Sequence, residues 1–240
     1  MSILSEILSD IRALFFPPRC PVCGERMERG EACVCTLCRA TAPLTGFWTE
    51  RDNPVARKFW GQLPVEQASA FLFYTRNSRW RLLIHAFKYR GMWRRAYEMG
   101  CWYGRCLSES GLYDGFDTVV PLPLHPLRLC RRGYNQAELI ARGIAEQLGA
   151  ELDTRSVRRR RNTDSQARTP KSERGRNVAG AFVVRRPERL AGRRVLLVDD
   201  VLTTGHTMSA CAEAILRAVP DCRIGIAALA SPPGELGIKG

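Results

Sequence analysis

Two adjacent carboxylates, Asp199 and Asp200, belong to the stretch of this sequence with the clearest chemistry. A loop containing Thr203, Thr204, Gly205 and Thr207 follows them directly. Hydroxyl groups and the free N–H groups at the start of a helix are suited to a phosphate. Carboxylates cannot bind that phosphate directly, but they suit sugar hydroxyls or a magnesium-bound sugar. A phosphate site beside a diol site describes a phosphorylated ribose.

The neighbouring residues predict the elements that position these groups. Residues 195–198, which follow Arg194, are aliphatic and β-branched, which is typical of a strand buried on both faces. Residues 208–218 carry apolar side chains at helical spacing, so we expect a helix that begins near His206 or Thr207. Ligands of open α/β sheets bind where strands end and helices begin, and Gly205 lets the backbone approach a ligand closely. The alternative is an ordinary turn whose acids only cap the helix.

Composition predicts a globular protein with an anionic partner. The chain has 240 residues, of which 45% are hydrophobic, and its formal net charge is +13. An excess of this size favours nucleic acid, a polyphosphate or an anionic surface as partner. The alternative is a basic protein whose arginines are simply solvated.

The sequence predicts a cytoplasmic protein without a membrane span. It contains no apolar run long enough to cross a bilayer. Residues 1–16 resemble a short amphipathic helix and lack the features of a secretory signal. In the cytoplasm, ten cysteines favour metal binding or free thiols over disulfides.

Two Cys-x-x-Cys pairs, about a dozen residues apart, predict a small zinc ribbon. We expect the ligands to be Cys20, Cys23, Cys35 and Cys38. Four protein thiolates leave no open position on zinc, so this metal would be structural. Cys33 could replace Cys35, although only Cys35 gives the two-residue spacing to Cys38. The alternatives are a redox pair and unligated thiols.

The remaining periodicities predict an α/β fold with a mainly parallel sheet flanked by helices. Expected strands cover residues 66–75, which could lie at a sheet edge, 117–124, 180–184 and 222–230. Expected helices cover residues 79–87, 93–107 and 137–148. Residues 41–64 resemble a linker, and residues 231–240 a tail. We therefore expect an N-terminal helix and zinc module at 1–45 and a larger domain at 65–240.

Basic side chains gather near residue 88, at residues 128–132 and in residues 155–177. They could neutralise pyrophosphate or a nucleic-acid backbone. Residues 155–177 form the most basic stretch and have no apolar stripe, so we interpret them as a loop leaving the sheet. The alternative is a set of solvated basic loops. The nucleic-acid candidates are Lys88, Arg131, Arg132, Arg158, Arg159, Arg160, Arg161 and Arg174.

The stretch 194–207 resembles the phosphoribosyl-pyrophosphate (PRPP) signature of type I phosphoribosyltransferases. Together with the cysteine pairs, the run 87–91 (FKYRG) and the run 131–136 (RRGYNQ), it makes nearly the whole chain similar to the ComF family of competence proteins. The resemblance implies a type I phosphoribosyltransferase-like domain with an N-terminal zinc module. It also implies magnesium bound with PRPP, and a role in natural transformation handling incoming single-stranded DNA.

The resemblance also assigns roles to individual residues. The acids Asp199 and Asp200 would hold the ribose hydroxyls and be the catalytic candidates. A loop at the end of an earlier strand would hold the pyrophosphate, and residues 121–125 occupy that place. In many relatives of this kind a flexible loop closes over PRPP, and residues 155–177 have the corresponding position. The PRPP-binding candidates are Asp199, Asp200, Val201, Thr203, Thr204, Gly205, His206, Thr207, Pro123, Leu124 and Arg128.

Two functions remain open at this stage. One is a PRPP-binding protein that contacts single-stranded DNA. The other is an active phosphoribosyltransferase that joins phosphoribose to an unidentified nitrogenous acceptor, although no motif marks an acceptor pocket or a general acid or base. A weaker expectation is that the zinc ribbon recruits a helicase or recombination protein.

Overall fold

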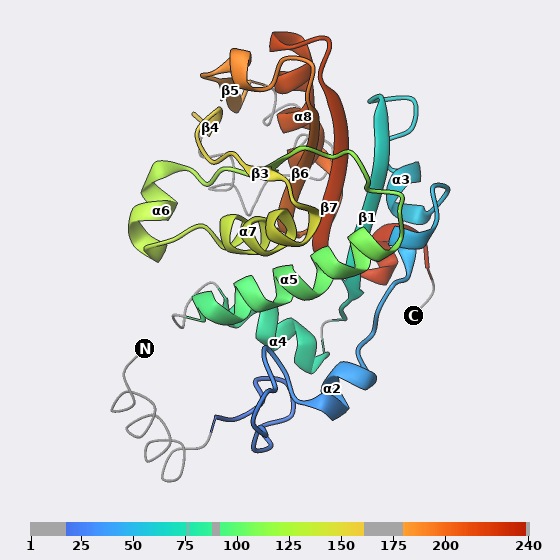
Figure 1. The fold of residues 1–240 in the computed structure, drawn as a ribbon, viewed down its shortest axis with the longest axis vertical. Helices are drawn as coiled ribbons and strands as arrows, with labels where there is room; N and C mark the ends of the chain where they lie inside the picture. Colours follow the sequence, from blue (N-terminus) through green and yellow to red (C-terminus); the bar gives the residue numbers. More distant parts are fainter. Residues whose placement is uncertain (1–17, 76, 88–91, 161–179, 239–240) are drawn as a thin grey trace.

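A sheet of five parallel strands, in the order β1-β7-β6-β2-β3, forms the core of the protein (Figure 1). The computed structural model describes residues 18–75, 77–87, 92–160 and 180–238. The aliphatic run at 195–198 lies in the central strand, and the predicted strand at 66–75 lies at an edge, as expected. The strands are β1 (Val65–Phe73), β2 (Thr118–Pro121), β3 (Glu151–Leu152), β6 (Arg194–Val201) and β7 (Arg223–Ser231).

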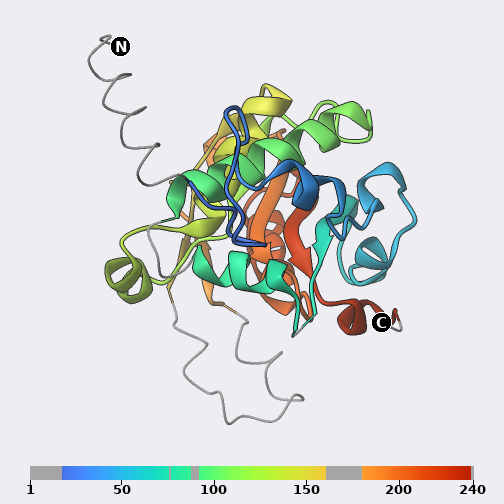
Figure 2. The ribbon, with the colours of Figure 1, turned by 90° about the horizontal axis from the view of Figure 1, so that it is seen from below.

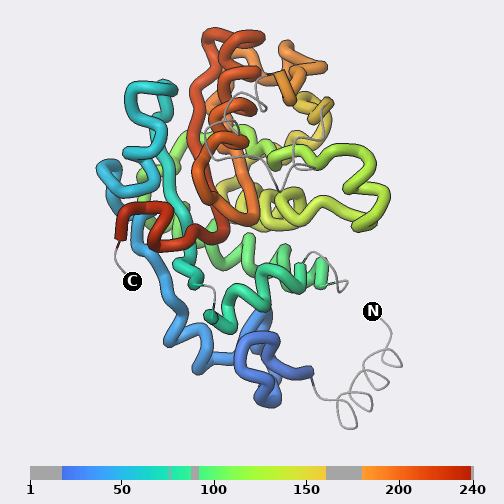
Figure 3. The backbone as a smooth tube through the Cα atoms, turned by 180° about the vertical axis from the view of Figure 1, so that it is seen from behind, coloured from blue at the N-terminus to red at the C-terminus, as the bar shows by residue number. Residues whose placement is uncertain are grey.

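Both faces of this sheet are covered, which explains why its strands are apolar without alternation. Leu196 and Val198 of β6 pack with α5 (Trp93–Glu109) and α7 (Gln136–Leu148). Val195 and Leu197 point the other way and pack with α8 (His206–Ala218). From behind, α8 is the orange-red coil lying over the strands (Figure 3). The predicted doubly covered α/β sheet is therefore confirmed.

Helices α5 and α7 approach each other closely because glycines line their contact. A Cβ atom on Gly143 would lie 2.5 Å from the carbonyl oxygen of Tyr97, and one on Gly100 would lie 2.3 Å from that of Ile140. Real Cβ atoms do not tolerate such distances, so only glycine allows this spacing. The long helix α5 is thereby held firmly on the sheet through α7. Helix α4 (Arg79–Ala86) precedes α5.

Residues 41–64, expected to be a linker, are instead packed against β1. Leu44 forms an antiparallel bridge with Leu72, and the side-chain amide of Asn53 donates to the carbonyl of Ala68 at 2.9 Å. Phe59 is fully buried. The stretch contains the 3-10 turn η1 (Phe47–Thr49) and the short helix α3 (Pro54–Arg57). Proline, glycine and charge dominated its composition and concealed these apolar anchors.

Two further elements depart from expectation at the opposite edge of the sheet. Residues 157–159 start the stretch interpreted as a loop, yet they form strand β4 (Val157–Arg159), which pairs antiparallel with β5 (Phe182–Val184). Residues 126–132, for which no element was predicted, form the short helix α6 (Pro126–Arg132), none of whose seven residues is buried. The remaining turns are η3 (Pro187–Arg189) and η4 (Pro233–Leu236).

The cysteine-rich segment packs onto the main core rather than standing apart. Seen from below, it runs as a blue chain alongside helix α5 (Figure 2). Cys20, Met27 and Val34 belong to the same apolar cluster as the residues of α5. The segment ends in the short helix α2 (Thr36–Ala40). No helix among the described residues is long and apolar enough to cross a membrane, and the amphipathic helix predicted at 1–16 lies outside them.

Candidate functional site

The loop between β6 and α8 lies at the carboxyl end of the central strand, where ligands of parallel sheets bind. Thr203, Thr204 and His206 are exposed there, and Thr207 is half-buried. Gly205 is the N-cap residue of α8, and within the described residues the first N–H groups of this helix have no side-chain cap. These donors therefore point towards the loop with the positive end of the helix dipole, an arrangement suited to a phosphate.

Gly205 is required by the geometry of this loop. Its φ of +84° lies in the left-handed region that favours glycine. A Cβ atom here would lie 3.4 Å from the ring of Phe59, which packs beneath the loop. Phe59 comes from the stretch expected to be a linker, so sequence reasoning missed this support. The signal was present as Asn53-Pro54, a cap followed by proline at the first helical position, with Val55 and Phe59 four residues apart.

Asp199 and Asp200 occupy the end of β6, and both are half-buried. The backbone N–H of Asp200 donates to the Asp199 carboxylate at 2.8 Å, which fixes the first side chain. Successive side chains of a strand point to opposite faces, so Asp199 lies on the α8 side and Asp200 on the α7 side. Burial raises the pKa of the Cys211 thiol on α8, and the charge of Asp199 raises it further. The two acids thus flank the strand end from both faces.

The loop predicted to hold pyrophosphate lies directly beside this site. Strand β2 pairs with β6, and the N–H of Leu122 donates to the carbonyl of Val198 at 2.7 Å. Pro123 and Leu124 therefore leave the sheet at the same edge as the two acids. Asn135, the N-cap of α7, anchors the loop by donating to the carbonyl of Leu122 at 3.1 Å.

The basic candidates are distributed over separate elements. Arg128, Arg131 and Arg132 all lie on α6, where Arg132 donates to Gln136 at 3.1 Å. Arg158 and Arg160 are exposed on or just after β4. Arg159 alternates inward and is buried, with its guanidinium 5.5 Å from the centre of the Phe182 ring. Arg159 is therefore the least exposed of the described nucleic-acid candidates, and its role remains a prediction. Lys88, Arg161 and Arg174 lie outside the described residues.

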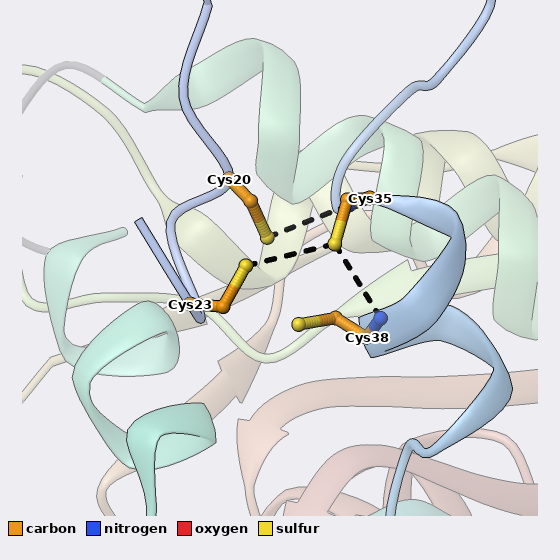
Figure 4. Close-up of side chains that lie close together, drawn as sticks. All are labelled: Cys20, Cys23, Cys35 and Cys38. Carbon is orange, nitrogen blue, oxygen red and sulfur yellow. Dashed lines mark hydrogen bonds between the residues drawn. The ribbon is translucent and has the colours of Figure 1, made fainter. Parts of the chain in front are cut away.

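Four cysteines form a second site, at the N-terminal end of the described chain. The thiols of Cys20, Cys23, Cys35 and Cys38 all lie within 4.8 Å of one another. Figure 4 shows their sulfur atoms converging, with those of Cys23 and Cys35 3.6 Å apart. A tetrahedral zinc with Zn–S bonds of about 2.3 Å needs sulfurs about 3.8 Å apart. The donor set therefore fits a structural metal, and it contains Cys35 rather than Cys33.

The backbone around Cys20 favours the thiolate form that binds metal. Burial raises the pKa of Cys20, but backbone N–H groups of Cys35, Cys23 and Val22 outweigh it and lower the pKa to about 7. Burial and the nearby Glu98 raise the pKa of Cys33 to about 11, and its thiol lies outside the group of four. Cys33 is therefore a buried neutral thiol beside the cluster.

Arg95 of α5 joins this module to the main domain and was not anticipated. Its guanidinium donates to the carbonyls of Ala32 and Cys33 at 3.0 and 2.6 Å, and it lies 3.1 Å from the sulfur of Met27. All three acceptors belong to the chain between the two cysteine pairs. No sequence signal identified Arg95, because its partners lie more than 60 residues away along the chain.

The region that contains the first site matches a known family. Residues 135–237 match the phosphoribosyl transferase domain family. The DNA utilization protein YhgH of Salmonella typhi and that of Escherichia coli K12 are each 37% identical over 101 residues, which is 42% of this chain and 44% of the relative. Competence protein F of Haemophilus influenzae is 35% identical over 94 residues, 39% of this chain and 41% of the relative. The chain thus spans less than half the length of these curated relatives.

Among solved structures, the glutamine PRPP amidotransferase of B. subtilis, complexed with ADP and GMP, matches at a TM-score of 0.41 and 16% identity. That match covers 60% of this chain and 30% of that structure. It is too distant to bear on function. The domain match and the sheet topology confirm the predicted type I phosphoribosyltransferase fold. The chain carries a phosphoribosyl transferase domain and has homologues named competence protein F and DNA utilization protein YhgH, which confirms its resemblance to the ComF family.

Proposed function

We propose that this protein binds PRPP with magnesium at the β6–α8 loop and acts in the handling of incoming single-stranded DNA during natural transformation. The observation that carries the proposal is the arrangement at the carboxyl end of β6. Two half-buried acids flank the strand end, and exposed threonines surround an uncapped helix N-terminus. The acids suit a ribose diol or its magnesium, and the loop suits a 5′-phosphate.

The adjacent loop completes the PRPP site in this proposal. Pro123 and Leu124 offer backbone groups to the pyrophosphate, because their strand lies next to β6. Arg128, half-buried in the first turn of α6, supplies the cation that a pyrophosphate needs. The catalytic role of Asp199 and Asp200 belongs to the same proposal and depends on turnover.

The DNA arm of the proposal has two supports. The relatives are named for DNA utilization and competence, and the chain has a formal charge of +13. Exposed arginines such as Arg131, Arg158 and Arg160 are the expected phosphate contacts. Neither the structure nor the comparisons support the helicase or recombination partner.

The proposed metal of the cysteine cluster is zinc, because four thiolates in tetrahedral arrangement are typical of structural zinc. The cations would have separate tasks: zinc would stabilise the N-terminal module, and magnesium would accompany PRPP.

Calorimetric titration of PRPP with magnesium tests the first site. We expect saturable binding by the wild type and loss of binding in the double variant Asp199→Asn/Asp200→Asn. Asparagine keeps the shape of each side chain and removes its charge. The matched control is Asp114→Asn/Asp221→Asn, which removes two exposed charges just before β2 and β7, at the opposite end of the sheet. A folded wild type that binds no PRPP would refute the proposal.

An active phosphoribosyltransferase is the alternative function of the same site. The measurement that separates the two is release of pyrophosphate from PRPP in the presence of ammonia, amines and nucleobases. Release that needs one acceptor and disappears in Asp199→Asn/Asp200→Asn would establish an enzyme. PRPP binding without release favours the binding function.

A further inference from the structure

A cavity of about 320 Å³ lies between the loop after β2 and strand β4. Its volume is at the lower end of the range of about 300–1,000 Å³ that is typical of small-molecule sites. Most of its wall is apolar and comes from Pro121, Pro123, Leu124, Pro126, Leu129 and Val157. Asn135, Glu138 and Thr154 add an amide, a carboxylate and a hydroxyl, and Arg158 and Arg159 add two guanidinium groups. An apolar wall with a few polar groups suits a flat heterocycle with polar edges.

A second depression, of about 570 Å³, is lined by Arg155, Arg158, Arg185 and Arg186. The two hollows adjoin, because Arg158 lines both of them. The antiparallel pairing of β4 and β5 brings these arginines together, and the N–H of Arg185 donates to the carbonyl of Ser156 at 2.7 Å. The turn before β4 is also fixed, because Asp153 accepts from the N–H groups of Arg155 and Ser156 at 2.8 and 2.9 Å.

These four guanidinium groups differ from the seven arginines of the described residues that form ion pairs with acids. Within the described residues, none of the four has a carboxylate within ion-pair distance. Four like charges around one depression repel each other unless an anion joins them. Arginines that do pair with acids are Arg57, Arg94, Arg142, Arg189, Arg193, Arg194 and Arg223.

We propose that the cavity and the depression together bind one nucleotide of single-stranded DNA, with its base in the cavity and its flanking phosphates on the four arginines. This inference rests on the DNA arm of the proposed function. Arginine is suited to phosphate because its planar fork can donate two hydrogen bonds at once. A single strand is the favoured partner, because a duplex would first have to unpair and unstack a base before the cavity could hold it.

The cavity also borders the PRPP site. Pro123 and Leu124 line it, and they belong to the loop that we assign to pyrophosphate. A base in the cavity and a pyrophosphate on the loop would therefore contact the same short segment. Binding of DNA and of PRPP should consequently affect each other, by the same factor in both directions.

Fluorescence anisotropy with a labelled twelve-residue oligothymidylate tests the inference. The variant Arg155→Gln/Arg186→Gln should bind about tenfold more weakly. Its slope of log affinity against log salt should fall by about 1.4, because each phosphate that an arginine neutralises on a single strand contributes about 0.7. Leu129→Asp, at an exposed position, should weaken binding without reducing that slope. The matched control is Arg51→Gln/Arg217→Gln, two exposed arginines that line neither hollow. A second readout is crosslinking of 5-iododeoxyuridine in the oligonucleotide, expected at residues 121–129 or 154–159.

The outcomes separate this inference from the proposed function. If the wild type binds the oligonucleotide but the test variants behave like the control, or the crosslinks lie elsewhere, the cavity is not the site and the DNA function stands. If inorganic phosphate competes as well as thymidine monophosphate does, the base is not recognised and the inference is wrong. If the wild type binds no oligonucleotide, both the inference and the DNA arm fail, whatever the result with PRPP.

Discussion

The cysteine module and the carboxyl edge of the sheet differ in whether their polar groups already have partners within the protein. In the module, four thiols face one another, and the carbonyls beside them are taken up by Arg95. At the sheet edge, threonines are exposed and the first N–H groups of α8 have no side-chain cap. The four thiols of the module can surround a metal that stabilises the fold. The hydroxyl and N–H groups at the sheet edge are instead available to a ligand. The comparison predicts that damage to the module affects stability, and damage to the edge affects binding.

Loss of one metal ligand should have the largest effect. In Cys20→Ser we expect the metal content to fall from about one per chain to near zero, because serine is a poor ligand for zinc. Structural zinc can contribute about 10 kcal/mol to the folding of a small module. Metal analysis and hydrogen exchange of residues 18–45 measure the two effects.

The control for this change is Cys33→Ser, which alters a buried cysteine outside the cluster and should keep the metal. Both Cys20→Ser and Cys33→Ser should still bind PRPP, because the cysteine module and the β6–α8 loop are separate sites. Metal retained by Cys20→Ser, with the fold unchanged, would show that the four thiols are not the ligand set.

Removal of the Arg95 side chain should have the next largest effect. Arg95→Ala leaves the carbonyls of Ala32 and Cys33 without their donor. We expect the free energy of unfolding to fall by about 2 kcal/mol, since hydrogen bonds from a charged donor contribute about 1.5–3 kcal/mol each and this side chain is partly exposed. Denaturant unfolding gives the change, and a metal competition assay should show weaker binding.

A substitution in the open loop should affect the ligand more than the fold. Gly205→Ala places a side chain at a φ of +84° and moves it towards Phe59. The cost in stability should be about 1 kcal/mol, whereas PRPP should bind about tenfold more weakly, which is about 1.4 kcal/mol. Gly149→Ala, at the C-terminal end of α7, is the control, because its φ of +65° also lies in the left-handed region and no atom lies within 4 Å of the new Cβ. Equal PRPP affinity in the two variants would argue against a phosphate at Gly205.

The smallest effect is expected next to Arg95. Arg94 forms an ion pair with Glu98 at 3.0 Å, and 78% of its side chain is exposed. Exposed pairs of this spacing contribute about 0.3–0.5 kcal/mol. Arg94→Ala should therefore change the unfolding free energy by no more than about that amount, with no change in metal affinity. If Arg94→Ala lowered the unfolding free energy as much as Arg95→Ala does, the loss of a positive charge would explain both changes. The hydrogen bonds from Arg95 to the module would then not be the cause.

Elements whose conformation is set by the residues next to them in the sequence could be predicted from the sequence. The buried run 195–198, the helix beginning at His206 and the cysteine spacing each specify one local geometry, and each was correct. Residues 41–64 were harder to predict, because the cap at Asn53-Pro54 is a short signal and the burial of Trp48 and Phe59 also depends on partners distant in the chain. Strand β4 was missed for a related reason: its alternation places Val157 and Arg159 inward, but the unbroken run of arginines that begins at Arg158 resembles a solvated loop.

The predicted roles of individual site residues remain predictions, although the structure shows which are neighbours. It brings Pro123 and Leu124 beside the two acids, because β2 and β6 pair. It also separates Arg159 from the exposed arginines on either side of it. Both results depend on pairing between distant strands, which a single sequence does not reveal.

The packing of residues 41–64 has a practical consequence for any attempt to isolate the larger domain. Strand β1 lies at the edge of the sheet, and this stretch covers it: the N–H of Thr45 donates to Phe71 and that of Phe73 donates to Pro43, at 3.0 and 2.8 Å. A fragment beginning at residue 65 would leave that apolar strand with unpaired backbone groups. Such edges add strands from other molecules and aggregate. A fragment beginning near residue 41 would keep the edge covered and is the better choice for expression.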